Sequence, residues 1–456
     1  MDIKGKKVLV IGLARSGMAA IRLLKKLGAQ VTLSESKPAG EIKELSLLQE
    51  LGVEVCGQEM AVFEREYDLC VKNPGVPYRA PFILRLEEKG VPVITEIELA
   101  FQTAKPQHYL AVTGTNGKTT TTTLLYEILA KAFPGKAHVC GNIGIPLCEI
   151  VLEENLLEEE GHYIALEISN KQLVNIDRFR PEAAVILNLT PDHLDFAPSL
   201  DEYYKSKVQV YRNMGEGDLF IVNADDPVLA EYLERYPVPC PKQSFSLEDP
   251  SAAGISADNY IKNGYLWVAG EKILPLESIK IPGRHNLQNV MAAASLARAA
   301  GVSASVIEQA VSSFMGVEHR IEFVREIDGV RYYNDSKGTN TDATVTALKA
   351  FDRGVILLLG GFEKGLDMSD VKAHLGCVKK VIGFGACGRR LVEDTAGSEG
   401  IVVTTLDEAV EAAASLAQAG DTVLLSPSTS SYDQYTCFEE RGEHFKRLVN
   451  ALQQNG

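Results

Sequence analysis

A short glycine-rich stretch, Thr113 to Thr120 (TGTNGKTT), constrains the fold of this chain more than any other feature. It follows an apolar, β-like run at residues 108–112 and precedes leucine and isoleucine residues at helical spacing. The stretch is therefore predicted to be a strand-to-helix turn whose backbone N–H groups, at the positive end of the helix, bind phosphate. Lys118 adds a mobile cation, and the Thr119 hydroxyl is placed to ligate Mg²⁺.

The stretch is a shortened form of the usual phosphate loop. In G-x-x-x-x-G-K-[ST] the first glycine would fall at Val112. A glycine-rich turn with an incidental lysine is the alternative, but strand, turn, Lys-Thr pair and helix all coincide, which favours a nucleoside triphosphate site. We predict that this site is formed by Gly114, Thr115, Asn116, Gly117, Lys118, Thr119 and Thr120.

Length and composition indicate a globular protein of several domains. The 456 residues predict about three domains. The net charge of −15 argues against a nucleic-acid partner, because binding to the phosphate backbone needs a basic surface. The eight cysteines include no C-x-x-C pair, and there is neither a signal-peptide core nor an apolar run of about 18 residues. We expect a cytoplasmic protein with reduced thiols and no membrane insertion.

The first βαβ unit indicates a second nucleotide site. A strand of the buried type at residues 7–11 leads through Gly12 and Gly17 into a helix. A second strand at residues 31–33 ends close to Glu35, an acid about 20 residues beyond the turn. Three interpretations stay open for this unit: a dinucleotide site, a site for another nucleotide or nucleotide sugar, and a helix-packing turn without a ligand.

Two further features bear on that first site. Ala14 replaces the middle glycine of G-x-G-x-x-G, so the backbone can approach a pyrophosphate less closely and the interpretation as an NAD site weakens. A strand at residues 69–72 ends in a rigid loop that contains Asn73 and Gly75. Ligands of open α/β sheets bind at such carboxyl strand ends.

Polar residues follow two other predicted strands, after the phosphate loop. The strand at residues 163–166 delivers Glu167 at its end, where phosphate-loop proteins hold Mg²⁺ with an acid. The strand at residues 184–188 opens into a loop with His193, for which we favour a ligand role over local capping. Both side chains are therefore predicted to lie beside a metal site.

Two other sets of residues are less decisive. A helix at residues 200–211 carries Lys205 and Lys207, and composition gives neither of them a role, since helix lysines are usually solvated. Asn286 and Asn289 precede an Ala-rich helix predicted over residues 290–300. Their spacing of three lets both amides face one edge of a ligand, whereas N-capping would explain only one of them.

The last part of the chain is predicted to be another doubly wound parallel sheet. It begins with a hairpin, residues 321–327 and 330–333, joined by Asp328-Gly329. Three apolar strands then open into polar or glycine-rich loops, each followed by a helix pattern. These strands are at residues 355–359, 381–384 and 422–425.

The chain resembles the Mur ligase family through a series of short sequences in a fixed order. They are GTNGKT, GNIG, a strand-end glutamate, NLTPDHLD, GRHNLQN, HR, NDSKGTN and LLLGG. The resemblance implies an α/β protein of three domains: a Rossmann-like domain that binds a UDP substrate (1–104), a central P-loop ATPase domain (105–316) and a Rossmann-like C-terminal domain that binds an amino acid (317–456). It implies a monomeric, ATP-dependent ligase that adds D-glutamate to UDP-N-acetylmuramoyl-L-alanine through an acyl phosphate, in peptidoglycan synthesis.

The resemblance also implies roles for particular residues. Lys118, Glu167, His193 and Lys207 would be catalytic, and Asn286, Arg320 and Asp335 would join the phosphate loop in binding ATP. Two Mg²⁺ sites are implied, with ligands from Thr119, Glu167, His193 and Lys207, the last carbamylated by CO₂. The UDP substrate would contact Leu13, Ala14, Arg15, Ser16, Glu35, Ser36, Asn73, Gly75 and Asn142. D-Glutamate would contact Lys337, Thr339, Lys364, Ser431 and Phe438.

One segment departs from the family pattern. Where the family reads E-[LI]-S-S-F-Q-L, this chain has Glu167 to Leu173 (EISNKQL), so Asn170 and Lys171 replace a hydroxyl and an aromatic residue. The departure bears on contacts to the muramoyl-alanyl part of the substrate. The alternatives are a sister ligase for another amino acid, a Rossmann-type nucleotide-dependent oxidoreductase, and a non-catalytic nucleotide-sugar sensor.

Overall fold

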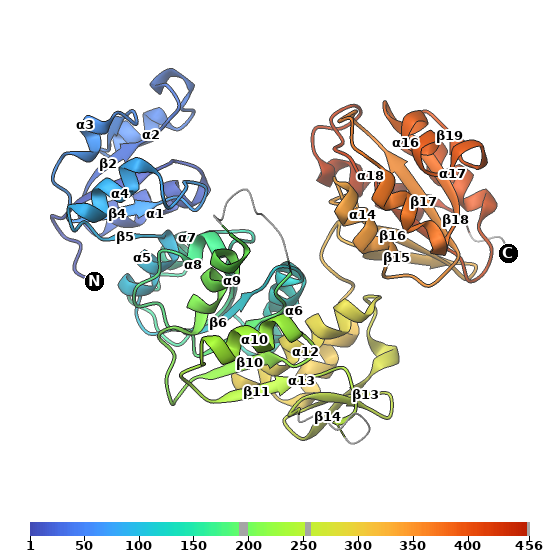
Figure 1. Cartoon of the computed structure of the whole chain (residues 1–456), viewed down its shortest axis with the longest axis horizontal. Helices are drawn as coiled ribbons and strands as arrows, with labels where there is room; N and C mark the ends of the chain where they lie inside the picture. Colours follow the sequence, from blue (N-terminus) through green and yellow to red (C-terminus); the bar gives the residue numbers. More distant parts are fainter. Residues whose placement is uncertain (191–198, 251–256, 454–456) are drawn as a thin grey trace. The chain divides into compact units, whose positions relative to one another are not determined.

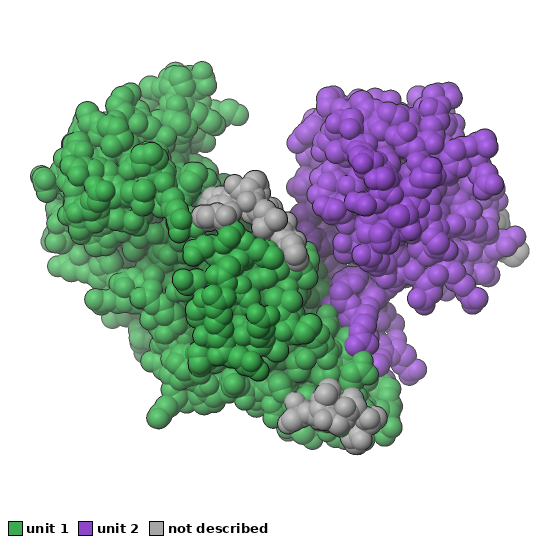
Figure 2. Space-filling model, viewed as in Figure 1, with its two compact units in different colours: residues 1–274, 288–310 green, residues 275–287, 311–456 purple. Residues whose placement is uncertain are grey.

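The computed structural model describes residues 1–190, 199–250 and 257–453, and the chain divides into two compact units (Figures 1 and 2). The first unit comprises residues 1–274 and 288–310, and the second comprises residues 275–287 and 311–456. The predicted α/β class with parallel sheets is confirmed. The division into three domains stays a prediction, and its boundary at residue 104 separates two sheets of the first unit.

The chain begins with a five-stranded parallel sheet in the order β3-β2-β1-β4-β5. Its strands are β1 Lys7–Ile11, β2 Gln30–Ser34, β3 Glu54–Cys56, β4 Leu69–Lys72 and β5 Val93–Ile94. Its helices are α1 Arg15–Lys26, α2 Leu45–Glu50, α3 Met60–Phe63 and α4 Pro81–Glu88. Val8 and Val10 of β1 join a core with α1, while Leu9 and Ile11 join one with α3 and α4. Both faces of β1 are therefore buried, which explains its continuous apolar sequence.

A six-stranded parallel sheet follows, in the order β11-β10-β9-β6-β8-β7. Its strands are β6 His108–Thr113, β7 Ala137–Gly141, β8 Tyr163–Glu167, β9 Ala183–Ile186, β10 Leu219–Asn223 and β11 Lys242–Phe245. Its helices include α6 Lys118–Ala132, α7 Leu147–Glu153, α8 Asn170–Leu173, α9 Leu200–Val208 and α10 Pro227–Arg235. The phosphate-loop strand β6 pairs with both β8 and β9, so the ends of three strands meet where that loop begins.

The remaining elements of this region are a small sheet and two helices. The sheet has the order β12-β13-β14, with strands Tyr260–Lys262, Tyr265–Val268 and Glu271–Pro275. The helices are α12 Arg284–Ala299 and α13 Ala304–Ser313. Helix α12 begins at Arg284 and not at residue 290, so Asn286 and Asn289 lie within its first two turns.

Helix α5 (Glu96–Thr103) joins the two large sheets of the first unit. It packs against α1 and α7, and one apolar core runs from β1 to the central sheet. The fully buried Glu98 carboxylate accepts N–H bonds from Asp177, Arg178 and Phe179 at 2.8–3.0 Å. Because a buried carboxylate needs such donors, this cluster ties α5 to the central domain.

Glu96, at the start of α5, is also buried but has fewer partners. Its Oε2 accepts a hydrogen bond from the Cys148 backbone N–H at 3.0 Å. Its Oε1 has no hydrogen-bond partner among the residues that the structure describes. Burial raises the pKa of the Glu96 carboxyl to about 7.

Replacing Glu96 with glutamine should remove a pH dependence of stability. Because burial raises the pKa of Glu96 in the folded state above its ordinary value of 4.5, the folded state retains a proton that the unfolded state loses between these two pKa values. Wild-type stability should therefore fall by about 3 kcal/mol as the pH rises from 4.5 through 7, and the variant should not share this loss. Urea unfolding at pH 5 and pH 8 measures it, with the exposed Glu50→Gln as control. The prediction is wrong if the free energy of unfolding changes by the same amount between pH 5 and pH 8 in the wild type and in Glu96→Gln.

The second unit contains the predicted second doubly wound sheet, in the order β15-β16-β20-β17-β18-β19. Its strands are β15 Glu322–Ile327, β16 Val330–Asn334, β17 Val355–Gly360, β18 Val378–Phe384, β19 Ile401–Val402 and β20 Thr422–Leu425. Its helices are α14 Thr341–Leu348, α15 Ser369–Ala373, α16 Gly388–Thr395, α17 Leu406–Leu416 and α18 Phe438–Ala451. Strands β15 and β16 form the predicted antiparallel hairpin, and the other strand pairs are parallel.

Both faces of this second sheet are covered. Leu357 of β17 packs with α14 and α16 residues on one face, and Leu358 packs with α17 and α18 residues on the other. This alternation is what a strand buried on both sides requires. No helix in the described part of the chain is both long and apolar enough to cross a membrane.

Candidate active site

The predicted phosphate loop lies between β6 and α6, as its sequence indicates. Gly114 has φ 145° and Gly117 has φ 83°, a left-handed conformation that glycine adopts without strain. Gly117 is the N-cap of α6, and a Cβ there would lie 2.2 Å from Oδ1 of Asn289. The loop therefore needs glycine for its backbone conformation and for the close approach of α12.

The loop is held by residues that follow β9. Asn188 Oδ1 accepts a hydrogen bond from the Asn116 N–H at 2.9 Å, and its Nδ2 donates to the Asn116 carbonyl at 3.1 Å. Thr115 Oγ1 donates to the Thr190 carbonyl at 3.0 Å and accepts from the Thr190 N–H at 3.2 Å. These contacts fix the loop before any phosphate binds. Asn188 and Thr190 were not predicted, although their NLT sequence at a carboxyl strand end is a signal for them.

Two lysines converge on one carbonyl of the loop. Lys118 Nζ donates to the carbonyls of Gly114 at 3.0 Å and Thr115 at 2.7 Å. Lys207 Nζ, from α9, donates to the same Gly114 carbonyl at 3.0 Å. Two cations at the positive end of α6 make this turn strongly attractive to a polyanion.

The structure distinguishes Lys207 from Lys205, which composition could not do. Lys207 is 1% exposed and lies 4.4 Å from the centre of the Tyr203 ring, whereas Lys205 is exposed. Helix α9 points Lys207 at the phosphate loop. A lysine that only keeps a protein soluble lies on the surface, so the burial of Lys207 beside this loop indicates another role.

Glu167 lies at the end of β8, beside the phosphate-loop strand, and its register partner in β6 is Val112. It is 2% exposed, and its Oε1 accepts a hydrogen bond from Asn142 Nδ2 at 2.8 Å. Its Oε2 is buried without a hydrogen-bond partner in the described residues. A buried carboxylate oxygen without a donor fits a cation ligand, and the half-buried Thr119 is the second residue of the nearby helix α6. His193 lies outside the described residues.

The segment that departs from the family pattern folds into a short helix, α8. Ser169 is its N-cap, and the Ser169 N–H and hydroxyl both donate to Gln172 Oε1 at 2.9 Å in a capping box. Ser169 and Gln172, which both match the family pattern, therefore carry the local structure. Asn170 is buried and Lys171 is half-buried.

A cavity of about 710 Å³ lies at the carboxyl end of the first sheet, β3-β2-β1-β4-β5. It is lined by five of the residues predicted for the UDP substrate: Leu13, Ala14, Arg15, Glu35 and Asn73. Ser16 and Gly75 are held beside it by the Asn73 side chain, with hydrogen bonds of 2.9 Å each. Asn142 lies instead beside Glu167 in the central domain.

Glu35 organises the turn of this cavity. Its Oε2 accepts the Leu13 N–H at 2.7 Å, and its Oε1 accepts the Ser36 N–H at 2.8 Å and the Lys37 N–H at 3.2 Å. Burial alone would raise the pKa of Glu35, but these backbone hydrogen bonds outweigh it and the pKa is lowered. The carboxylate stays ionised and holds the β1–α1 turn to the end of β2.

The other residues predicted to bind ATP lie in the second unit. Asp335 is buried, and its Oδ2 accepts a hydrogen bond from the Ser426 hydroxyl at 2.7 Å. Burial raises the pKa of its carboxyl to about 7, despite this hydrogen bond and the nearby Arg320 guanidinium. The Arg320 side chain is exposed. Asn286 donates to the Pro282 carbonyl at 2.6 Å.

Four of the five residues predicted to bind D-glutamate lie on loops at the carboxyl edge of the large sheet of the second unit, and the fifth, Phe438, is the first residue of α18. Lys364 Nζ donates to the Thr339 carbonyl at 3.2 Å. Lys337 Nζ lies 5.7 Å from the centre of the Phe438 ring. The Ser431 hydroxyl is buried without a hydrogen-bond partner among the residues described. Cationic and hydroxyl groups gathered in this way suit a dicarboxylate.

Sequence reasoning missed Arg441, which holds three of these loops together. It is fully buried and donates to the Ser336 carbonyl at 2.9 Å, the Thr429 carbonyl at 3.1 Å and the Gly360 carbonyl at 3.3 Å. Burial lowers the pKa of Arg441 to about 10. A charged residue inside an amphipathic helix, α18, was the only signal for it in the sequence.

Comparisons with known proteins agree with this geometry. Residues 112–297 match the Mur ligase middle domain, and residues 319–429 match the Mur ligase glutamate ligase domain. UDP-N-acetylmuramoylalanine–D-glutamate ligases of Geobacillus kaustophilus and Geobacillus sp. are 41% and 39% identical over 98% of each chain. The fold is similar to the crystal structure of MurF ligase from Thermotoga maritima in complex with ADP, with a TM-score of 0.56, 17% identity, and 98% of this chain and 96% of that chain covered.

A phosphate loop with a buried carboxylate on the adjacent parallel strand defines an enzyme that uses a nucleoside triphosphate. Two domain matches and near-complete alignment with D-glutamate ligases narrow that class. The chain belongs to the Mur ligase family, whose members are ATP-dependent ligases. The predicted family is confirmed. The alternative of a nucleotide-dependent oxidoreductase is therefore not needed to explain the first βαβ unit.

Proposed function

We propose that this chain adds D-glutamate to UDP-N-acetylmuramoyl-L-alanine in an ATP-dependent reaction of peptidoglycan precursor synthesis. Relatives that carry the name of this activity align with almost the whole chain at about 40% identity. The observation that carries the proposal is the phosphate loop at Gly114 to Thr120, with two lysines directed at it. A non-catalytic nucleotide-sugar sensor would not need this loop.

The proposed reaction has two steps, phosphoryl transfer and acyl transfer, and negative charge develops in each of them. The terminal carboxylate of the sugar nucleotide attacks the γ-phosphorus of ATP, which gives an acyl phosphate and ADP. The amine of D-glutamate then attacks the acyl carbon, phosphate leaves, and an amide forms with loss of a proton. Lys118, the loop N–H groups and the amino end of α6 stabilise the charge on the phosphoryl group.

The donor set fits Mg²⁺, as the unpartnered Oε2 of Glu167 indicates. We propose that Thr119, Glu167 and His193, with Lys207 as a carbamate, hold two Mg²⁺ ions. When bound, Mg²⁺ would neutralise charge on the phosphates and the transferred group.

We propose binding regions for the other two substrates. The uridine diphosphate group would occupy the cavity around Leu13 to Ser16, Glu35, Ser36, Asn73 and Gly75. Asn142 would contact another part of the same substrate, near Glu167. The carboxylates of D-glutamate would bind at Lys337, Thr339, Lys364 and Ser431, beside Phe438. We also propose that the chain works in the cytoplasm as a monomer, on these small molecules alone.

A substrate panel tests the proposal. Phosphate release should require ATP, Mg²⁺, UDP-N-acetylmuramoyl-L-alanine and D-glutamate together, with rates at least about 100-fold higher than with L-alanine or L-lysine. A coupled phosphate assay and mass spectrometry of the product measure it. Turnover with another amino acid alone would identify a sister ligase. Nucleotide-sugar binding without phosphate release under any condition would identify a sensor.

A further inference from the structure

The predicted nucleotide contact Arg320 sits in an unusual backbone segment of the second unit. The Arg320 N–H donates to the Val317 carbonyl at 3.0 Å, which closes a β-turn. His319, at the third position of this turn, has φ 63°, and Ile321 has φ 44°. Residues other than glycine rarely adopt such angles, least of all a β-branched one. The turn therefore depends on its surroundings to keep this conformation.

Buried polar contacts hold the turn on both sides of Arg320. The His319 N–H donates to Glu322 Oε2 at 2.9 Å, and the His319 carbonyl accepts the Lys337 N–H at 2.9 Å. The Ile321 N–H donates to Asp335 Oδ1 at 3.2 Å. Glu322 and Asp335 are 8% and 4% exposed. Both peptide N–H groups beside Arg320 are therefore fixed by carboxylates.

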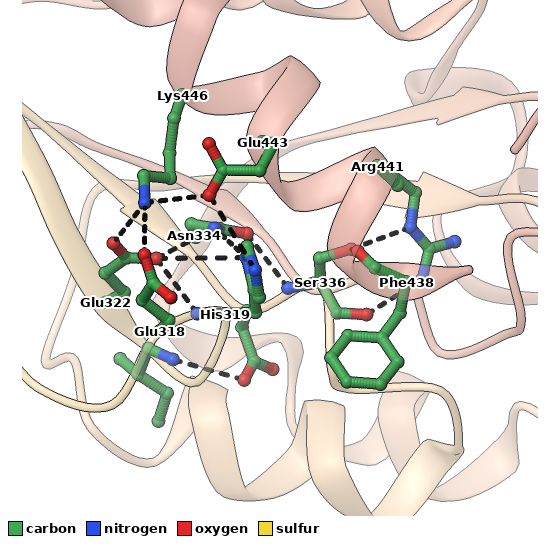
Figure 3. A network of polar contacts seen from close by, with 11 residues as sticks. Glu318, His319, Glu322, Asn334, Ser336, Phe438, Arg441, Glu443 and Lys446 are labelled. Carbon is green, nitrogen blue, oxygen red and sulfur yellow. Dashed lines mark hydrogen bonds and ion pairs between the residues drawn. The ribbon is translucent and has the colours of Figure 1, made fainter. Parts of the chain in front are cut away.

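The His319 ring is fixed as well (Figure 3). Asn334 Oδ1 accepts the Ser336 N–H at 3.1 Å, which sets the orientation of the Asn334 amide. Its Nδ2 then lies 2.9 Å from His319 Nδ1 and 3.0 Å from Glu322 Oε2, so Nδ1 must be the acceptor. The ring fills the space beside Gly442 of α18, where an added Cβ would lie 2.1 Å from Nδ1.

Lys446 connects this turn to α18. Its Nζ lies 3.1 Å from Glu322, 3.0 Å from Glu318 and 3.0 Å from Glu443 (Figure 3). The Glu318 side chain is largely exposed and the Glu443 side chain is half exposed, whereas the Glu322 side chain is only 11% exposed. Burial alone would lower the pKa of Lys446, but the three carboxylates outweigh it and the pKa is raised. The pair with Glu322 is the buried one, so its loss would leave a buried charge unpaired.

We propose that Lys446 is a positioning residue for the nucleotide. Through Glu322 it holds the His319 N–H and the Asn334 amide, and so keeps the turn in the conformation that presents the exposed Arg320 guanidinium. The proposal rests on the proposed function, which gives Arg320 its nucleotide contact. Among the described residues, the ion pairs of Lys446 are with Glu318, Glu322 and Glu443, and not with Arg320 or a residue predicted to bind substrate.

The first test replaces Lys446 with methionine, which keeps the length of the side chain and removes its charge. The KM for ATP and the Kd for ADP should each rise about tenfold, while the KM for D-glutamate should change less than about twofold. Lys446→Arg should restore most of the affinity. Arg447→Met, one residue further along α18 and exposed, is the matched control and should behave as wild type.

A double-mutant cycle separates positioning from general loss of structure. In an Arg320→Ala background, Lys446→Met should add less than about twofold to the Kd for ADP, because the group that it positions is gone. Gly442→Ala is a second probe: alanine suits a helix better than glycine, so a tenfold higher Kd for ADP at an undiminished Tm would come from displacement of His319.

The outcomes distinguish the two proposals. If Arg320→Ala raises the Kd for ADP and Lys446→Met adds its full effect on top, the positioning role is wrong and the proposed function stands. If Arg320→Ala leaves the Kd for ADP unchanged, the nucleotide contact of Arg320 and the role of Lys446 are both wrong. An unchanged Kd in Lys446→Met would also overturn the inference.

Discussion

Replacing Lys118 with alanine should reduce phosphate release at least about 100-fold, the effect of removing one charge-stabilising donor from a transition state. Lys118 is the first residue of α6, and its Nζ lies within hydrogen-bonding distance of two loop carbonyls. A triphosphate in the loop would give that ammonium an anionic partner in place of carbonyl oxygens. Its electrostatic contribution should grow as charge develops on the transferred phosphoryl group.

The matched control is Lys131→Ala, in the last turn of the same helix and exposed. It changes the net charge by the same amount and leaves the loop intact, so its rate should stay near that of the wild type. Stopped-time phosphate assays with saturating substrates measure both rates. A Lys118→Ala variant with near-normal phosphate release would remove the assignment of this loop as the ATP site.

Buried strands such as β1 and β17 could be predicted because burial on both faces leaves a simple signature in their sequences. A strand covered on both faces has no polar face, and residues 8–11 and 355–359 are unbroken apolar runs. In the structure, alternate residues of each run enter different cores. The glycine-rich turn was predictable for a different reason: Gly117 has a left-handed backbone conformation that few other residues adopt.

Residues that act across long stretches of sequence could not be predicted from local pattern. Arg441 contacts carbonyls 12 to 105 residues away, and Lys446 contacts Glu318 across 128 residues. Neither spacing has a periodicity. The loop partners Asn188 and Thr190 are about 75 residues from the turn that they hold, and only the parallel pairing of β6 with β9 brings them there.

Helix phase explains a third kind of limit. Lys205 and Lys207 are two residues apart on α9, so they face different directions, and one is exposed while the other is buried. Which face of α9 meets the phosphate loop depends on tertiary packing. The start of α12 was misplaced because Arg284, His285 and Asn286 are polar, so the first turn of this helix lacks the apolar periodicity on which the prediction depended.

Replacing Lys207 with alanine should lower turnover about 100-fold, whereas Lys205→Ala on the same helix should leave it near the wild-type rate. For carbamylation the Lys207 ammonium first loses a proton, and the neutral amine then joins CO₂ and releases a second proton, which leaves an anionic carbamate in place of a cation. The buried amine lies beside the phosphate loop, where an added carboxylate could join Glu167 as a metal ligand. The described residues contain no cluster of three or more histidine, cysteine or acidic side chains that could hold a metal. A carbamate would add oxygen ligands to those proposed from Thr119, Glu167 and His193.

Chemical rescue separates carbamylation from a plain cationic role for Lys207. If the carbamate supplies the missing oxygens, formate or acetate should restore part of the activity of Lys207→Ala, and removal of dissolved CO₂ should slow the wild type reversibly. If the ammonium itself acts, short amines should rescue instead, and CO₂ should have no effect. Mass spectrometry of the intact protein does not separate the two roles of Lys207, because carbamates are lost on acidification. ¹³C NMR with labelled bicarbonate observes the carbamate directly. Lys205→Ala should give the same ¹³C signal as the wild type, and Lys207→Ala should give none.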